Sequence, residues 1–406
     1  MTSISVRQYV VGTYRELELK EAEITKVQTG GPDGGTSSPL HNSPLELADL
    51  PSHQDLGSNE ILLSNEKYLA IIDGSGVLAD PNGLDRGELV RLAKARKMVS
   101  HFDRAKLSKD GYAVLIEDID VTLPSGEVIP DGTDFRNSAH FRYQADIFVP
   151  CGGRPEAVSI SNVGQLFDAA GKPHYKYVIE GANLFFTHQA RMYLEKRGVV
   201  VFKDSSANKG GVTSSSLEVL AGLSLSDQVG CFLFFSFSFI CYCCQNVFTD
   251  VRVQEYVDLM IFKDGKPSTF YQTYVKEIQK IIQENAAMEF ACIWAEHTKH
   301  GGTKARTLIS DELSSTLNNL QAKLEGSDLF DDATTRQAVM KCAIPKTIIN
   351  QVGLETLLKR IPEAHQRALF SSWIAAHFVS FLSPLSLCLC YRGVFFPHVT
   401  DRMVFC

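Results

Sequence analysis

Residues 177–218 read YVIEGANLFFTHQARMYLEKRGVVVFKDSSANKGGVTSSSLE, which predicts a strand, a helix, a second strand and a polar loop. The first strand is the apolar run 177–179, followed by the polar letters EGAN. Thr187 is a suitable N-cap for the helix, and Gly198 can end it because glycine adopts the left-handed conformation at little cost. Residues 199–202 are β-branched or aromatic, as expected of a strand covered on both faces.

A polar segment with paired glycines, 204–212, follows the second strand, and small hydroxyl residues occupy 213–216. Paired glycines allow the backbone to come close to a ligand or to another segment. We therefore expect a loop at 204–212 that belongs to a binding site. The pattern alone fits a plain connector equally well, because β-α-β units are common.

Four more apolar runs predict strands at 24–28, 68–72, 112–116 and 145–149. Helices or loops separate the six strands, which indicates an α/β fold with a mostly parallel, doubly wound sheet. A capping pair, Asp85 with Glu88, begins one of these helices. Each polar or glycine-rich cluster follows a strand, and ligands bind at the carboxyl edge of such sheets.

Composition excludes several classes of protein. The net charge of -7 argues against a nucleic-acid-binding surface, which is usually basic. No run is long and apolar enough to span a bilayer, and the start MTSISVRQ lacks the regions of a signal peptide. Seven of the ten cysteines fall in two unusual segments, and Cys151, Cys292 and Cys342 make no disulfide or metal framework. We expect no metal site, no membrane and no nucleic acid.

A glycine-rich turn, TGGPDG at 29–34, follows the first strand. If residues 35–54 are an insertion, Gly34 joins the letters DLG that end at Gly57, and the turn contains G-x-x-G before a helix. Such a turn places a dinucleotide's pyrophosphate at a helix N-terminus. Asp73 follows Gly57 by 16 residues, near the spacing at which a carboxylate binds the adenosine ribose and disfavours NADP. The alternative is an ordinary turn, with Asp73 as a cap.

The series VQTGGPDG, DLGSNE, IIDGSGVLADPNGLD, ADIFVPCGGRP, VIEGANLF and FKDSSANKGGVTSSSLEV resembles the nicotinamide-binding domain of glutamate dehydrogenases, most closely the large NAD-dependent type of fungi and other eukaryotic microbes. The resemblance implies a Rossmann-type domain at 1–228 and a helical region at 255–379. It also implies NAD as the cofactor, and L-glutamate, 2-oxoglutarate and ammonia as the reactants of a reversible oxidative deamination.

Site residues can be carried over from this resemblance one at a time. Gly34, Gly57 and Ser58 would line the pyrophosphate and Asp73 the adenosine ribose, while Cys151 and Gly152 would lie along the cofactor. Asn183 and Asn208 would hold the nicotinamide ribose and carboxamide, Thr2 would reach the nicotinamide amide, and Ser215 would touch the substrate. Lys209 departs from the family, whose smaller members have alanine there.

No catalytic residue is identified, because in the family the catalytic lysine and aspartate belong to a substrate domain that precedes the nicotinamide domain. Lys203, Lys209 and Asp204 are poor substitutes, since loop residues usually face solvent. We keep two alternatives: a non-catalytic NAD-binding module, and a related amino-acid dehydrogenase. The resemblance further implies a homo-oligomer and a cytoplasmic location, with a mitochondrial one as the alternative.

Three segments fit neither the pattern nor the family: 35–54, 229–254 and 380–406. The last two are rich in residues with pyrimidine-rich codons, so we interpret them as retained introns read as protein. The alternatives for 229–254 are an exposed hairpin or partner-binding segment, and a metal site at the letters CYCC. No second cysteine pair or histidine stands at zinc-ligand spacing, which disfavours metal.

Overall fold

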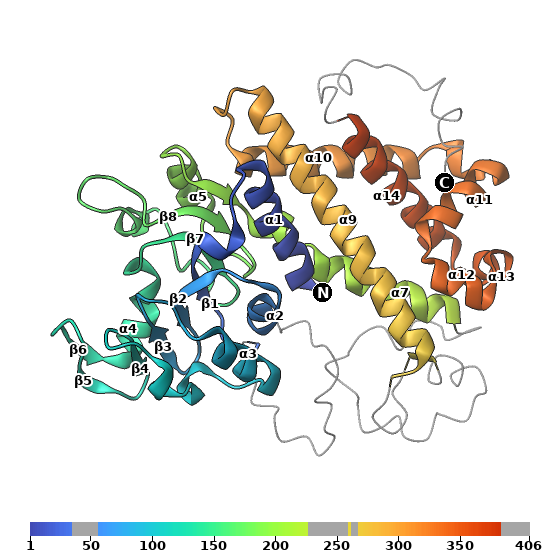
Figure 1. The fold of residues 1–406 in the computed structure, drawn as a ribbon. Coiled ribbons are helices and arrows are strands. Elements are labelled where there is room, and N and C mark those ends of the chain that lie inside the picture. Colours follow the sequence, from blue (N-terminus) through green and yellow to red (C-terminus); the bar gives the residue numbers. More distant parts are fainter. Residues whose placement is uncertain (35–55, 226–258, 261–266, 383–406) are drawn as a thin grey trace. The chain divides into compact units, whose positions relative to one another are not determined.

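The computed structural model describes residues 1–34, 56–225, 259–260 and 267–382 (Figure 1). The interruptions predicted at 35–54 and 229–254, and the tail after residue 382, lie outside these residues. The chain forms two compact units. The first consists of Met1–Gly211 with Gln283–Ser310, and the second of Val212–Ile282 with the chain from Asp311 onward. The boundary expected at residue 228 stays a prediction.

A seven-stranded sheet in the order β4-β3-β2-β1-β7-β8-β9 organises the first unit. β1 pairs in parallel with both β2 and β7, and β8 and β9 continue the parallel part. A separate hairpin joins β5 to β6. The strands are β1 (Thr25–Thr29), β2 (Lys67–Ile72), β3 (Gly76–Ala79), β4 (Tyr112–Leu115), β5 (Ile119–Thr122), β6 (Val128–Asp131), β7 (Ala145–Pro150), β8 (Tyr175–Ile179) and β9 (Val200–Phe202).

The prediction of a mostly parallel, doubly wound α/β sheet is confirmed, but the sheet strand β3 and the hairpin strands β5 and β6 were not predicted. The four residues of β3 begin at Gly76, the last of the turn letters DGSG, and they give too short a pattern to predict a strand. β3 pairs antiparallel with β2 and with β4, so β3 runs against its two neighbours, and β4, the strand predicted at 112–116, ends the sheet in the same direction as β2. The chain then returns to β7, which pairs with β1 on its other side.

Helices cover both faces of the sheet. Val77 and Ala79 of β3 belong to one apolar core, and Leu78 belongs to another. Because successive side chains of a strand point to opposite faces, the two cores lie on the two faces of the sheet. The core around Leu78 contains Leu89 and Leu92, and the other contains Ala190 and Leu194. The helices are α1 (Thr2–Glu16), α2 (Leu56–Leu63), α3 (Arg86–Ala95), α4 (Gly132–Ser138), α5 (His188–Glu195), α6 (Asp204–Ala207), α7 (Gly210–Leu225), α9 (Thr269–Lys299), α10 (Arg306–Glu325), α11 (Ala333–Ala343), α12 (Lys346–Val352), α13 (Leu354–Arg360) and α14 (Glu363–Leu382).

The predicted helix ends are largely confirmed. The Asp85 side chain accepts a hydrogen bond from Glu88 N at 2.7 Å and begins α3, and Thr187 caps α5 through Ala190 N. Gly198 has a φ of 85°, as expected where a helix ends in the left-handed conformation. The prediction of a polar loop at 204–212 was wrong, because α6 and the first turn of α7 occupy these residues. Gly210 and Gly211 begin a helix there.

The second unit is helical in the part that the structure describes, as predicted for 255–379. Tyr274 of α9 donates to Leu217 O of α7 at 2.6 Å, and Glu277 accepts from the backbone at the start of α12. Pro345 and Gly353 lie at the two ends of α12. Within the described ranges no helix has both the length and the apolar character that a bilayer crossing requires.

Four glycines allow close contact between the first strand, its neighbour and α2. A Cβ on Gly57 would lie 2.5 Å from Gly31 O and 2.6 Å from Gly30 O. A Cβ on Gly30 would lie 2.7 Å from Gly152 N, in the turn after β7. Gly30 also has a φ of 87°. The turn after β1 is therefore packed by backbone against backbone, and a side chain fits on neither Gly30 nor Gly57.

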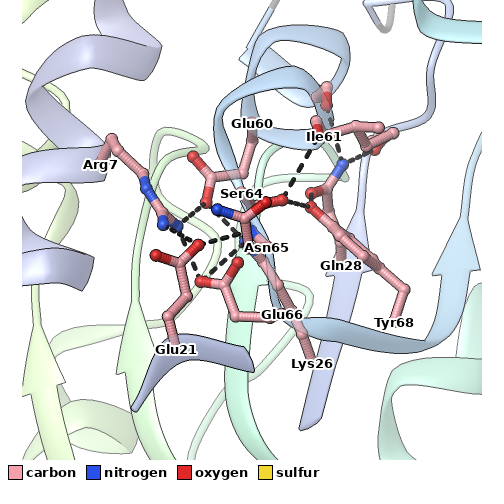
Figure 2. A network of polar contacts seen from close by, with 12 residues as sticks. Arg7, Glu21, Lys26, Gln28, Glu60, Ile61, Ser64, Asn65, Glu66 and Tyr68 are labelled. Carbon is pink, nitrogen blue, oxygen red and sulfur yellow. Dashed lines mark hydrogen bonds and ion pairs between the residues drawn. The ribbon is translucent and has the colours of Figure 1, made fainter. Parts of the chain in front are cut away.

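A buried cluster of charges lies beside this turn and joins β1, α1 and α2 (Figure 2). Lys26 Nζ is 2.5 Å from Glu60 Oε1, and Arg7 Nη1 is 2.7 Å from Glu66 Oε1. The Lys26, Glu60 and Glu66 side chains are completely buried. Burial favours the neutral amine of Lys26, but Glu60 and Glu66 hold the Lys26 pKa above its ordinary value.

Gln28 connects the charged cluster to the glycine turn. Its Nε2 donates to Gly30 O at 2.8 Å and to Gly57 O at 3.1 Å. Its Oε1 accepts from Tyr68 OH at 3.1 Å, and the Lys26 ammonium lies 5.1 Å from the centre of the Tyr68 ring. Figure 2 shows Gln28 between Tyr68 and the turn. One buried amide therefore joins the end of β1 to the start of α2.

We expect Gly57→Ala to destabilise the first unit by about 1–3 kcal/mol, because the added methyl group meets two backbone oxygens that cannot move independently. Urea unfolding followed by circular dichroism measures this change. Gly164→Ala is the matched control, since a Cβ there meets nothing within 4 Å. We expect the control to change stability by less than about 0.5 kcal/mol. Equal effects of the two substitutions would refute the tight turn.

We expect a pH-dependent effect of Glu66→Gln. Burial disfavours the Glu66 carboxylate, but Lys26 and Arg7 outweigh burial and lower its pKa from 4.5 to about 2. Stability from this carboxylate is present above pH 4.5 and is lost as the pH falls toward 2. The wild type should exceed Glu66→Gln by about 3 kcal/mol at neutral pH, and the difference should shrink in acid.

Urea unfolding of both proteins between pH 2 and 7 measures that difference. Glu23→Gln is the control, because the Glu23 side chain is 69% exposed in its pair with Lys20. Such surface pairs contribute only about 0–1 kcal/mol. A wild-type advantage over Glu66→Gln that stays constant down to pH 2 would contradict the assigned ion pairs.

Candidate functional site

The carboxyl edge of the parallel strands carries every polar cluster that the sequence analysis singled out. β2, β1, β7, β8 and β9 run in the same direction, so the segments that follow them lie along one edge. The chain leaves β1 toward β2 on one side and later returns to β7 on the other. The switch point is therefore between β1 and β7, which is where open α/β sheets bind ligands.

Two segments meet at this switch point. Cys151 N and Gly152 N both donate to Thr29 O, at 2.7 and 3.0 Å, and Thr29 Oγ1 donates to Gly152 O. Gly30 N donates to Ile72 O, which ties the turn to β2 as well. Burial raises the pKa of the Cys151 thiol well above its ordinary value. Burial therefore favours the neutral thiol of Cys151, and its predicted place along the cofactor stays a prediction.

Gly34, Gly57 and Ser58 lie at the two ends of the glycine turn. Gly34 has a φ of 88° and donates from its N to Gly31 O at 3.2 Å. Gly57 and Ser58 are the second and third residues of α2, where backbone N–H groups point out of the helix start. The sequence singled out Gly34 and Gly57, and the structure adds Gly30 as an equally constrained position.

Asp73 directly follows β2, as predicted, and its side chain is engaged in a turn. Its Oδ1 accepts from Ser75 N at 2.8 Å and from Ser75 Oγ at 2.7 Å, and its Oδ2 accepts from Val99 N at 2.7 Å. Asp73 is 5% exposed, and burial raises its pKa. The Asp73 carboxylate therefore holds the connection between β2 and β3. Its predicted contact with a ribose stays a prediction.

The structure brings Asn183 and Asn208 together from the ends of two neighbouring strands. Asn208 Nδ2 donates to Asn183 Oδ1 at 2.6 Å and to Gly181 O at 3.0 Å. Gly181 N and Ala182 N both donate to Pro150 O, which fixes this segment against the end of β7. Two amide side chains thus lie side by side at the carboxyl edge of the sheet.

Thr2 lies at the start of α1, close to the segment that follows β9. A Cβ on Gly211 would lie 2.8 Å from Thr2 Oγ1. Ser5 Oγ donates to Ala207 O at 2.7 Å and accepts from Gly210 N at 3.1 Å. The first turn of α1 is therefore fixed to the start of α7. Ser215 lies on the part of α7 that belongs to the second unit, and its predicted contact with substrate stays a prediction.

Two of the rejected catalytic substitutes are engaged in ion pairs. Lys209 Nζ lies 2.7 Å from both carboxylate oxygens of Glu289, on the part of α9 that belongs to the first unit. Asp204 Oδ1 lies 3.1 Å from Arg191 Nη2. Lys209 stands where the smaller family members have alanine, and the carboxylate of Glu289 balances its positive charge. That neither Lys209 nor Asp204 is a catalytic base stays a prediction.

Sequence reasoning missed the buried residues that support the site, namely Lys26, Gln28, Glu60 and Arg191. One signal was present in the sequence: Lys26 and Gln28 are polar residues within a strand that is otherwise covered. A polar residue buried in a strand needs a partner. The sequence gives no means of finding that partner, because Glu60 lies 34 residues from Lys26.

Comparisons with known proteins agree with this geometry. A sequence profile of the family described as Glutamate/Leucine/Phenylalanine/Valine dehydrogenase matches residues 54–228. The protein named NAD-specific glutamate dehydrogenase in Neurospora crassa is 48% identical over 381 residues, covering 93% of this chain and 32% of the relative. Glutamate dehydrogenase 2 of Dictyostelium discoideum is 42% identical over 382 residues, with 93% and 32% covered.

A solved structure of glutamate dehydrogenase from Plasmodium falciparum aligns with a TM-score of 0.41 and 15% identity, over 75% of this chain and 47% of that chain. The strand order described above establishes the fold independently of that alignment. The chain spans about a third of the length of the curated relatives that it matches. With the profile match at 54–228 and 48% identity over 93% of its length, the chain is similar to part of the NAD-specific glutamate dehydrogenases.

Proposed function

We propose that the first unit binds NAD and serves the reversible oxidative deamination of L-glutamate to 2-oxoglutarate and ammonia. The observation that carries the proposal is the contact among Gly30, Gly57 and Gly152 at the switch point of the sheet. Because side chains are excluded at these positions, the turn after β1 packs directly against the start of α2, the arrangement in which a dinucleotide's pyrophosphate can meet a helix N-terminus. The names of the relatives support NAD as the dinucleotide.

The proposed contacts follow the order of the strands. Gly34, Gly57 and Ser58 would hold the pyrophosphate after β1, and Asp73 would hold the adenosine ribose after β2. Cys151 and Gly152 would lie along the cofactor after β7. Asn183 and Asn208, after β8 and β9, would hold the nicotinamide ribose and carboxamide, with Thr2 at the nicotinamide amide and Ser215 at the substrate.

Bound NAD would supply a hydride acceptor for the α-carbon of the amino acid. The side chains of this chain would bind and orient: the amides of Asn183 and Asn208, which lie side by side, would fix which face of the nicotinamide ring is presented. Proton transfer needs a lysine and a carboxylate, and we propose that these belong to a substrate domain like the one that precedes this region in the family.

Two alternatives to this function are each supported by an observation. The ion pairs of Lys209 and Asp204 are consistent with a chain that binds NAD without catalysis by itself. The family profile also includes leucine, phenylalanine and valine dehydrogenases, so another amino-acid substrate fits the same cofactor domain. A homo-oligomeric state, and a cytoplasmic rather than mitochondrial location, stay predictions.

We expect the 406-residue chain to bind NADH and to show no turnover of L-glutamate by itself. Isothermal titration with NADH and a dye-linked assay of glutamate oxidation measure the two properties. Failure to bind NADH would contradict the proposal. Turnover by the chain alone would contradict the assignment of the proton-transfer groups to another domain.

We expect Asp73→Asn to raise the affinity for NADP relative to NAD by about tenfold, because the substitution removes a negative charge beside the 2′-position and keeps the side-chain shape. Titration of each nucleotide measures the ratio. Asp80→Asn is the matched control: Asp80 is also buried and accepts from Asn82 N and Ser108 N, but it follows the antiparallel β3. An unchanged NAD to NADP ratio in Asp73→Asn would refute the ribose contact.

A further inference from the structure

Arg191 of α5 contacts two carboxylates that belong to two different strand ends. Its Nε donates to Glu180 Oε1 at 2.6 Å, and its Nη2 donates to Glu180 Oε2 at 2.8 Å and to Asp204 Oδ1 at 3.1 Å. Glu180 directly follows β8, and Asp204 lies two residues after β9. One guanidinium group therefore joins the ends of two neighbouring parallel strands.

These three side chains are almost completely withdrawn from water. Glu180 is 0% exposed, Arg191 5% and Asp204 6%. Burial raises the pKa of Glu180 to about 7, although the hydrogen bonds and charge of Arg191 act in the opposite direction. Only arginine offers the planar fork that binds one carboxylate with two parallel hydrogen bonds and keeps a donor for a second.

The two carboxylates fix the segments that carry the paired asparagines. Asp204 Oδ2 accepts from Leu184 N at 2.7 Å, the residue directly after Asn183. Leu184 has a φ of 57°, an unfavourable conformation for a residue with a side chain, so this contact holds a strained backbone in place. On the other segment, Asn208 N donates to Asp204 O at 2.8 Å.

We infer that Arg191 is a positioning residue for the nicotinamide end of the cofactor. Through Glu180 and Asp204 it fixes the two segments that bring the amides of Asn183 and Asn208 to 2.6 Å from each other. Arg191 itself makes no contact with the cofactor in this assignment. The inference rests on the proposed function, since it presumes that NAD binds along the carboxyl edge.

The effect should be confined to one end of the dinucleotide. The adenosine and pyrophosphate contacts proposed above come from the segments after β2 and β1. In the sheet order β2-β1-β7-β8-β9, the strand β7 separates β1 from the strands whose ends Arg191 joins. Loss of the Arg191 fork should therefore disturb the nicotinamide end and leave the ADP-ribose end intact.

Binding of NADH and of ADP-ribose to the full chain tests this inference. ADP-ribose has the adenosine and pyrophosphate of NADH and lacks the nicotinamide. We expect Arg191→Lys, which keeps the charge and loses the fork, to weaken NADH binding by about tenfold and ADP-ribose binding by less than about twofold. Arg197→Lys, an exposed arginine near the end of the same helix, should change neither affinity.

Circular dichroism shows whether Arg191→Lys folds. If it does not fold, a second variant tests the same inference. Asp204→Asn keeps the side-chain volume and weakens one of the two contacts of Arg191, and we expect the same selective loss of NADH affinity. Equal losses of both ligands in a folded variant, or no loss of either, would overturn the positioning role. Failure of the unmodified chain to bind both ligands would instead refute the proposed function.

Discussion

The contact of Gly30 with Gly57 and Gly152 is the constraint on which the site depends. The contact occurs where the chain order of the sheet reverses. Three backbone segments approach so closely there that the α-carbons of these glycines have room for a hydrogen atom and not for a side chain. Each glycine is needed because a neighbouring backbone fills the place of its side chain. This close packing sets the turn against the start of α2, where we propose that a ligand's phosphate accepts from backbone N–H groups.

Two buried groups of charges support the two ends of the proposed site. Lys26, Glu60 and Gln28 connect β1 to α2 beneath the glycine turn, and Arg191 with its two carboxylates connects β8 to β9. Buried ion pairs contribute little net stability, because desolvation offsets much of the attraction between charges. Their geometric specificity is the greater benefit here, since a cofactor site needs its polar groups held in fixed positions.

Much of the fold followed from the sequence because its signals are local. Strand runs, the Asp85 and Thr187 caps and the glycine ends depend on residues a few positions apart, and these were predicted correctly. β3, β5 and β6 were missed because four residues give too short a pattern, and 204–212 was taken for a loop because glycine pairs seldom begin helices. The supporting ion pairs could not be predicted, since Lys26 meets Glu60 only after the sheet and helix have formed. Asn183 and Asn208, in contrast, were found through family motifs at adjacent strand ends.

A crystal structure of the 406-residue chain with NADH would test the central claim most directly. The account predicts the pyrophosphate over the turn of Gly30 and Gly57, and the nicotinamide beside Asn183 and Asn208. NADH bound away from the carboxyl edge of the sheet, or with its pyrophosphate remote from the glycine turn, would contradict the account.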